Sequence, residues 1–244
     1  MTKQGEELKV YLIIFLTIFF RFDDIEAASK TLCGATDDRV LWNDLKIARV
    51  HNAVLGKHGC TATLFSDRCL ISAGHCENFF KVLEFNVPLS NPDGSINHAK
   101  AEDTFLVDPS SLILGSGGAN DWAVMRAQPN STGHYPGEIY GYYPIGFNVD
   151  ANDIIIIAGY GQSRLKEYNN ILKIADGIIG KISNSRLYYQ IDTTSGDSGA
   201  AIINQNNEIV GIHTLGGCNN DYNKGLYIGV NPELMDAITK CVSE

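Results

Sequence analysis

The sequence of 244 residues has little positive charge: 19 Lys and Arg stand against 28 Asp and Glu, giving a formal net charge of -9. Proteins that bind a phosphate backbone need a surplus of Lys and Arg, so no nucleic-acid partner is predicted. The chain also lacks internal repeats and low-complexity tracts, which excludes solenoids and fibrous proteins. With 44% hydrophobic and 19% charged residues, it is not a disordered chain either.

No apolar run is long enough to cross a bilayer as a helix, which takes about 20 residues. The longest run, residues 10–20, follows a short polar start and resembles the hydrophobic region of a secretory signal peptide. Small residues at 27–29 offer a cleavage site. We therefore expect a signal peptide at residues 1–29, secretion to the extracellular space, and a mature domain over residues 30–244 without stable membrane insertion. The alternative is an uncleaved anchor or a buried strand.

The rest of the chain alternates short apolar runs with clusters of Gly, Asn, Asp and Pro, which is typical of strands joined by turns. The runs lie at residues 60–65, 70–73, 81–87, 122–125, 154–158, 171–174, 200–203, 209–213 and 226–230. A helix is expected at about residues 232–242, because Asn231 can cap it and Pro232 can occupy its first position. The pattern predicts an all-β barrel or sandwich with a C-terminal helix, with a seam at about residues 128–146.

Three segments carry residues suited to nucleophilic catalysis. His75 follows an apolar run in Ala-Gly-His-Cys, Asp121 precedes another in Asn-Asp-Trp-Ala-Val, and Ser198 stands in Ser-Gly-Asp-Ser-Gly-Ala. A serine needs an adjacent base to accept its proton, and a carboxylate must orient that base. Gly196 permits a tight turn in which the N–H groups of Gly196 and Ser198 point at one developing oxyanion. Taken singly, each motif is as readily a turn, a cap or a packed histidine.

The strings TATLFSDRCLISAGHC, NDWAVM and TSGDSGAAIINQNNEIVGIHTLGG resemble the chymotrypsin-type serine peptidase family, and within it the glutamyl endopeptidase branch. The resemblance covers about residues 33–242. It implies two packed six-stranded antiparallel β-barrels at about residues 40–140 and 146–231, with the C-terminal helix after them. It also implies hydrolysis of protein or peptide substrates through an acyl-enzyme, with no cofactor. We expect a monomer. The alternative is a non-catalytic relative that binds a partner through the same cleft.

The resemblance leaves the specificity pocket open between two readings. His213 and Thr193 match positions that bind a Glu side chain in the glutamyl branch, and Thr214 and Gly216 are expected to line the same pocket. Asp192 instead occupies the position where trypsin-like enzymes place the acid that binds Lys or Arg. A free carboxylate there would repel a Glu side chain. We favour Glu, provided that Asp192 is turned away or paired.

Asp197 needs a partner if it is buried, because an unpaired buried carboxylate is costly. In chymotrypsin-like zymogens a new N-terminal ammonium neutralises this acid. The sequence contains no Arg or Lys followed by the Ile/Val-Ile/Val-Gly-Gly string that would supply one. The remaining candidates are an internal cation such as Arg39 or Arg49, or solvent exposure of the carboxylate.

Six cysteines in a secreted protein predict disulfides. The resemblance implies a bridge between Cys60 and Cys76, which closes the loop behind His75. The other four cysteines allow three pairings. Of these we favour Cys33–Cys218, which ties the N-terminal arm to the specificity region, together with Cys69–Cys241, which fastens the terminal helix to the first barrel. No metal site is predicted, since neither a Cys-x-x-Cys nor a His-x-x-x-His spacing occurs.

Overall fold

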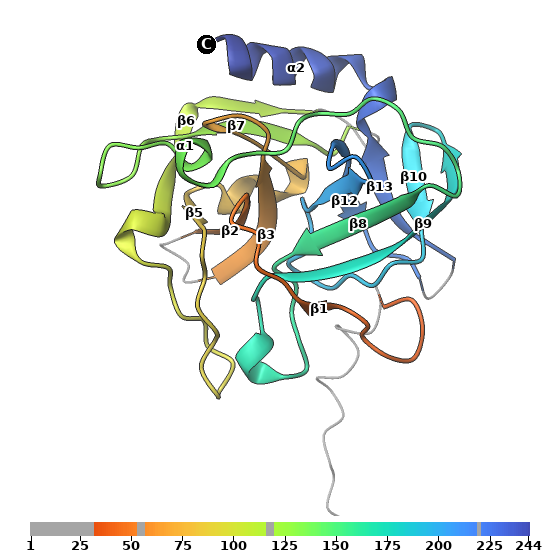
Figure 1. Ribbon diagram of the computed structural model, residues 1–244, viewed down its shortest axis with the longest axis horizontal. Helices are drawn as coiled ribbons and strands as arrows, with labels where there is room; N and C mark the ends of the chain where they lie inside the picture. Colours follow the sequence, from red (N-terminus) through yellow and green to blue (C-terminus); the bar gives the residue numbers. More distant parts are fainter. Residues whose placement is uncertain (1–31, 53–56, 116–119, 219–220) are drawn as a thin grey trace, which may run out of the picture.

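The computed structural model describes residues 32–52, 57–115, 120–218 and 221–244, with no account of the side chains at 57 and 58. The expected signal peptide at residues 1–29 lies outside these ranges. Over the ranges that are described, every helix is too short or too polar to cross a membrane. Two β-barrels lie side by side, and the C-terminal helix lies along one end of the molecule (Figure 1).

The first barrel closes six antiparallel strands in the order β2-β3-β4-β7-β6-β5. These strands are β2 (Ile47–Asn52), β3 (Lys57–Leu64), β4 (Cys69–Ser72), β5 (Val82–Glu84), β6 (Thr104–Leu114) and β7 (Ala123–Ala127). Inward-facing side chains from several strands, among them Leu64, Leu70, Leu83 and Met125, are fully buried in its core. Burying such side chains stabilises the barrel by about 1.5–3 kcal/mol each.

The second barrel closes because β8 pairs with both β11 and β9 in the order β9-β10-β13-β12-β11-β8. Its strands are β8 (Ile154–Gly159), β9 (Lys173–Ser183), β10 (Arg186–Tyr189), β11 (Ala201–Asn204), β12 (Ile209–Leu215) and β13 (Asn223–Tyr227). A two-residue strand, β1 (Val40–Leu41), pairs with β9. The segment around residue 40 therefore adds to the second sheet and not to the first barrel. The predicted fold of two six-stranded barrels is confirmed.

The C-terminal helix α2 (Pro232–Ser243) begins as its sequence indicates. Asn231 Oδ1 accepts a hydrogen bond from Leu234 N at 3.0 Å, and Pro232 occupies the first helical turn. Leu234, Ile238 and Cys241 are buried on one face, and this face packs on strands of the first barrel. Sequence patterns did not reveal the one-turn helix α1 (Pro136–Tyr140).

All three expected disulfides are present: Cys33–Cys218, Cys60–Cys76 and Cys69–Cys241. The first joins the segment before β1 to the chain after β12, the second lies beside the Ser198 carbonyl, and the third joins β4 to α2. The four cysteines whose pairing the sequence left open are therefore paired as favoured.

The apolar runs predicted nine of the strands approximately. They missed the two-residue strand β1 and three longer strands, β2, β6 and β10. Each of these three longer strands has polar residues at buried positions or has many of its residues exposed. In β2, for example, Arg49 and His51 are buried. Their partners come from other strands, so apolar periodicity along the chain does not identify them.

Candidate active site

The pairing of β4 with β7 brings His75 to Asp121. Ser72, the last residue of β4, lies opposite Ala123, the first residue of β7. The chain after β4 and the chain before β7 therefore leave the sheet at the same edge. There Asp121 Oδ2 lies 2.8 Å from His75 Nδ1, and Asp121 Oδ1 accepts the backbone N–H of His75 at 2.8 Å.

This double contact sets the charge of both groups. The hydrogen bond with Asp121 raises the pKa of His75 above its ordinary value of 6.5, despite partial burial. Burial by itself raises the pKa of Asp121, but the hydrogen bonds from His75 outweigh it and the pKa falls below its ordinary value. Asp121 is therefore ionised, and its contact with Nδ1 leaves Nε2 as the open ring nitrogen of His75.

The predicted nucleophile Ser198 lies in the loop before β11, and this loop is held between the barrels. The Ser198 carbonyl accepts the N–H of Thr61 from β3 at 2.8 Å, and Cys76 Sγ lies 3.9 Å from the same oxygen. Gly199 N donates to His213 O at 2.9 Å. Among the described residues, no hydrogen bond joins the Ser198 hydroxyl to His75. Catalytic hydrogen bonds are commonly long until a substrate binds.

Gly196 has the geometry that its predicted role requires. Its φ of +105° is one that side-chain-bearing residues rarely adopt, and an added Cβ would lie 2.6 Å from the carbonyl oxygen of Tyr160. Among the described hydrogen bonds, neither the N–H of Gly196 nor that of Ser198 donates to another part of the fold. Both amides are thus available to an oxyanion.

Asp192 does not offer a free carboxylate to the pocket. It is 5% exposed, and its two oxygens accept the backbone N–H groups of Cys33 at 2.6 Å and Asp38 at 2.7 Å. Both donors belong to the N-terminal arm, which we define as residues 33–39. The carboxylate is therefore paired with this arm. This meets the condition under which the sequence favoured a pocket for Glu, namely that Asp192 is turned away or paired.

His213 lies in β12 beside Tyr189 of β10, and both side chains are buried. The hydroxyl of Tyr189 lies 2.7 Å from His213 Nδ1. Burial lowers the pKa of His213 to about 4 and raises the pKa of Tyr189 well above 10. At neutral pH both groups are therefore uncharged, and the imidazole is held in one orientation by the phenol.

The other predicted pocket residues lie near the same strands. The hydroxyl of Thr193 accepts a hydrogen bond from Asn223 Nδ2 at 3.0 Å, and the hydroxyl of Thr214 lies 3.5 Å from Arg186 Nη1. Gly216 follows β12 directly and is partly exposed.

The partner of Asp197 is Arg39, not Arg49. Arg39 Nη1 lies 2.7 Å from Asp197 Oδ2, and the carboxylate is 3% exposed, so solvent does not stabilise it. Arg49 instead forms a buried ion pair with Glu84, at 2.6 Å between Nη2 and Oε2. The sequence offered Arg39 and Arg49 equally, since only the fold decides which arginine reaches the loop.

Two clusters in the described ranges combine three groups of metal-ligating type, but neither has a suitable donor set. In the first, Cys60 and Cys76 are joined as a disulfide beside His75 and offer no thiolate. The second contains His51, Glu84 and His98. Glu84 already accepts the guanidinium of Arg49, a fixed positive charge that disfavours a cation.

Sequence motifs missed Tyr189, Asn223 and Arg186. Each lies on a strand next to a pocket residue, yet no recognisable motif surrounds it. Only the pairing of β10 with β13, and of β13 with β12, brings them to the pocket. No local signal could have identified them.

Comparison with known proteins identifies the family and related folds. The family model described as Trypsin matches residues 45–238. The glutamyl endopeptidase of Staphylococcus epidermidis is 31% identical over 120 residues, which cover 48% of this chain and 40% of that protein. The glutamyl endopeptidase of Staphylococcus aureus is 28% identical over 116 residues, covering 47% of this chain and 33% of that protein. Each match thus spans well under half of the relative's length.

Solved structures share the fold at low identity. A Glu endopeptidase in complex with MPD has a TM-score of 0.69 at 20% identity, with 87% of this chain and all of that chain covered. Human heparin binding protein has a TM-score of 0.62 at 14% identity, covering 84% and 97%. The fold is that of a two-barrel protein of the chymotrypsin type. Because the family model covers most of its length, the chain belongs to the trypsin family.

Proposed function

We propose that the protein is a serine endopeptidase with Ser198 as nucleophile, His75 as general base and acid, and Asp121 as the orienting carboxylate. The observation that carries this proposal is the two-point contact of Asp121 with the ring and the backbone of His75, whose neighbour Cys76 has its Sγ 3.9 Å from the Ser198 carbonyl oxygen. Such a contact fixes the tautomer that leaves Nε2 free to accept a proton.

In the proposed reaction, Ser198 Oγ attacks the peptide carbonyl carbon while its proton passes to His75 Nε2. The carbonyl oxygen becomes an oxyanion, which the N–H groups of Gly196 and Ser198 stabilise. Collapse breaks the C–N bond, and His75 delivers its proton to the leaving amine. A water molecule then hydrolyses the acyl-enzyme, again with His75 as base. One oxyanion donor contributes about 3–4 kcal/mol to lowering the barrier.

We further propose cleavage after Glu. If the hydroxyl of Tyr189 donates to His213 Nδ1, the imidazole carries its proton on Nε2 and can donate it to a substrate carboxylate. Thr193, Thr214 and Gly216 line the same pocket in this proposal. Asp192 is engaged by the amides of Cys33 and Asp38, which argues against the trypsin-like alternative of cleavage after Lys or Arg.

Secretion is proposed on two grounds. The apolar segment at residues 10–20 has the length of a signal-peptide core. In addition, all six cysteines are paired as disulfides, which form and persist in oxidising compartments. We propose a monomer that acts on protein or peptide substrates.

The competing function is that of a non-catalytic binding protein. The fold is compatible with it, since human heparin binding protein has a similar structure. Heparin is a polyanion, however, and this chain has a net charge of -9, which disfavours that type of ligand. The intact order of His75, Asp121 and Ser198 supports the enzyme.

A serine-directed phosphonate tests the proposal. The folded protein is expected to form a covalent adduct on Ser198, located by peptide mass mapping. The Ser198→Ala variant should not react, and the His75→Ala variant should react far more slowly. Folded protein that forms no adduct would contradict the enzyme assignment. Peptides that differ only in Glu, Asp, Arg or Phe before the scissile bond then test specificity, with faster cleavage after Glu expected.

A further inference from the structure

We propose that Arg39 is a positioning residue: its side chain holds the oxyanion loop in its active shape, so that activity requires no new N-terminus. This inference rests on the proposed function. It concerns the loop that begins at Thr194 and ends at Ser198, which we call the oxyanion loop.

All five N–H donors of Arg39 are satisfied. Nε and one N–H of Nη2 bind both oxygens of Asp37 at 2.8 Å, and the other N–H of Nη2 donates to Gln162 O at 2.7 Å. Nη1 donates to Thr194 Oγ1 and to Asp197 Oδ2, both at 2.7 Å. The side chain is 2% exposed. A guanidinium whose five donors all have partners is fixed in position and direction.

Asp197 transmits this position to the loop. Its Oδ1 accepts Gly161 N at 2.8 Å, and its Oδ2 accepts Thr194 N at 2.8 Å in addition to Arg39. Residue 197 lies between Gly196 and Ser198, the two residues whose amides form the proposed oxyanion hole. When the carboxylate is held at three points, the peptide planes on both sides of it are held as well.

The site is shaped to receive the guanidinium. A Cβ added to Gly161 would lie 2.3 Å from both Arg39 Nη1 and Asp197 Oδ2, and 2.4 Å from Thr194 Oγ1. Any side chain at 161 would therefore displace the ion pair. Gly161 is thus required by the ion pair, which indicates that the loop is built around Arg39.

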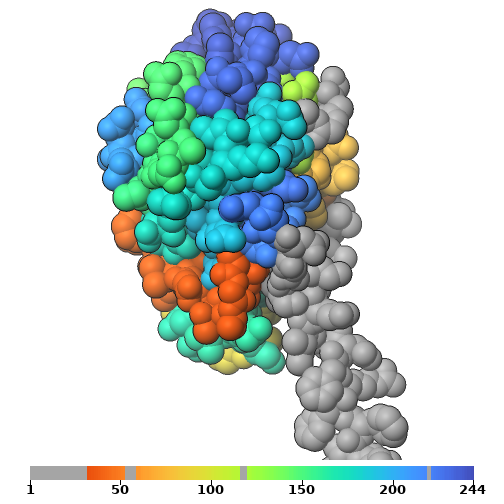
Figure 2. All heavy atoms as spheres, turned by 90° about the vertical axis from the view of Figure 1, so that its right-hand side faces the viewer, coloured from red at the N-terminus to blue at the C-terminus, as the bar shows by residue number. Residues whose placement is uncertain are grey.

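The N-terminal arm is anchored at points other than Arg39. The Cys33–Cys218 disulfide joins one end of the arm to the second barrel, and Asp192 binds the amides of Cys33 and Asp38. Figure 2 shows the arm, in orange, against the cyan and blue atoms of the second barrel. Arg39 is therefore held beside Asp197 by the arm's own attachments.

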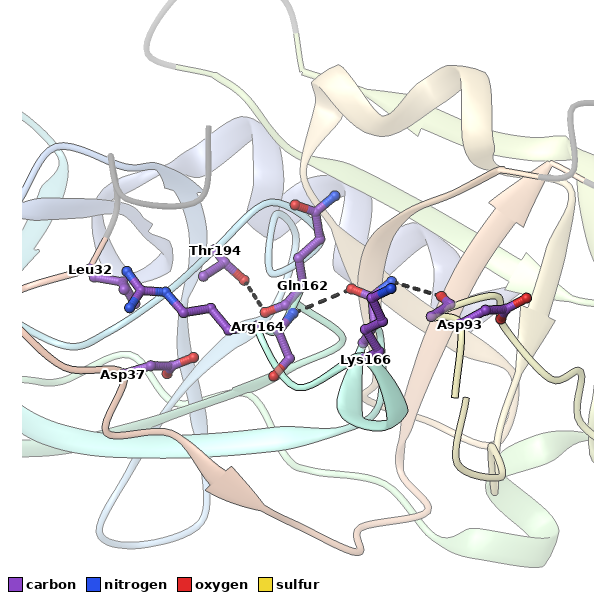
Figure 3. Close-up of a pocket in the computed structure, with 10 residues that line it drawn as sticks. Leu32, Asp37, Asp93, Gln162, Arg164, Lys166 and Thr194 are labelled. Atoms are coloured by element: carbon purple, nitrogen blue, oxygen red, sulfur yellow. Dashed lines mark hydrogen bonds between the residues drawn. The ribbon is translucent and has the colours of Figure 1, made fainter. Parts of the chain in front are cut away.

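Two adjoining surface pockets lead to this ion pair. One, of about 360 Å³, is lined by Asp37, Gln162 and Thr194 (Figure 3). The other, of about 480 Å³, is lined by Asp37, Arg39 and Lys173 among others. Because Arg39 itself forms part of the wall of the second pocket, a shortened side chain at position 39 would extend this pocket toward Asp197 and admit a small cation.

The test compares the wild-type protein with its variants at equal folded fraction. Two quantities are measured: the rate of phosphonate labelling of Ser198, and kcat and KM on one peptide. Protein whose chain begins at residue 30, after removal of the expected signal peptide, should label without any further cleavage between residues 30 and 39. Arg39→Gln should label about 100-fold more slowly, comparable to the loss of one oxyanion donor, with the loss in kcat and little change in KM. Arg39→Lys should recover part of the rate, because it restores the positive charge but not the planar guanidinium that binds several acceptors at once.

Two further variants separate positioning from general stability. Guanidinium ion added well below denaturing concentrations should increase the labelling rate of Arg39→Ala. Gly161→Ala, whose Cβ would displace the ion pair, should lower the labelling rate as Arg39→Gln does. Arg164→Gln is the matched control, since Arg164 is exposed on the same pocket wall, and it should label at the wild-type rate.

Three results would overturn the inference while leaving the proposed function intact: Arg39→Gln labelling at the wild-type rate, Arg39→Ala that guanidinium does not accelerate, or protein beginning at residue 30 that labels only after a further cleavage between residues 30 and 39. A folded wild-type protein that never labels would overturn the proposed function, and the role of Arg39 with it.

Discussion

The carboxylate of Asp192 accepts the backbone N–H of Asp38, at 2.7 Å and 154 positions away in the chain. A second amide, from Cys33, occupies its other oxygen. The residue that would make the pocket trypsin-like thus serves to dock the N-terminal arm.

Asp192→Asn should therefore affect stability more than specificity. The substitution points an NH₂ group at one of two backbone N–H donors, which costs about 1–3 kcal/mol of unfolding free energy. Denaturant unfolding measures this loss. The ratio of kcat/KM for peptides with Glu and Arg before the scissile bond should stay constant. Asp38→Asn, which changes an exposed side chain of the same arm, is the control. Efficient cleavage after Arg that disappears in Asp192→Asn would return this residue to the pocket.

His213→Val should lower kcat/KM for a Glu peptide about 10- to 100-fold, because a hydrogen bond to a charged group is worth about 1.5–3 kcal/mol. The matching Gln peptide should lose much less, so the preference for Glu over Gln shrinks. Tyr189→Phe retains the imidazole but removes the hydroxyl that orients it, and should cause a smaller loss. Equal losses for Glu and Gln peptides would mean that His213 does not contact the substrate carboxylate.

The pH dependence of kcat/KM should follow His75. Catalysis needs neutral His75, and Asp121 raises its pKa above 6.5, so activity should rise with pH through a value above 6.5. Asp121→Asn removes the negative partner, so the acid limb should move to lower pH while the rate falls, by about 10⁴-fold in the serine peptidase template. An acid limb that stays in place in Asp121→Asn would show that another group controls it.

His213 should make the protein less stable in acid. Its folded-state pKa of about 4 lies below the value of 6.5 expected in the unfolded chain, so the unfolded state binds more protons between these values. The stabilisation is complete above about pH 6.5 and is lost as pH falls toward 4, by about 3 kcal/mol. Unfolding free energies of wild type and His213→Gln, measured at both ends of this range, should converge on acidification. Parallel curves would contradict a buried neutral His213.

Two of the disulfides should differ in what their removal affects. Replacing Cys60 and Cys76 by Ser should cost about 3 kcal/mol for a loop of this size, and should lower activity further, because Cys76 adjoins both His75 and the carbonyl of Ser198. Replacing Cys69 and Cys241 should cost stability but leave the activity of the folded fraction unchanged, since Cys241 lies beside Met125 of β7, near the end of α2 opposite to the one that contacts Asn120. Equal activity losses in the two double variants would argue against a specific role for the Cys60–Cys76 bridge.

The sequence by itself determined the strand-rich class, the capped C-terminal helix and the residues suited to catalysis. Each of these depends on a few consecutive residues. Asn231 and Pro232 begin a helix through a local hydrogen bond and a fixed φ. Gly196 has a positive φ that residues with a side chain adopt only with strain. Resemblance to a family supplied the two barrels and the bridge beside His75.

Only the tertiary structure decided which charged groups meet. Whether Asp192 faces a substrate or the N-terminal arm, and whether Arg39 or Arg49 reaches Asp197, depends on contacts between residues more than 100 positions apart. Nothing in the residues around Asp192 or Asp197 encodes these partners. They follow from strand register and from the path of the arm, since a buried charge is stable only where the fold brings it a partner.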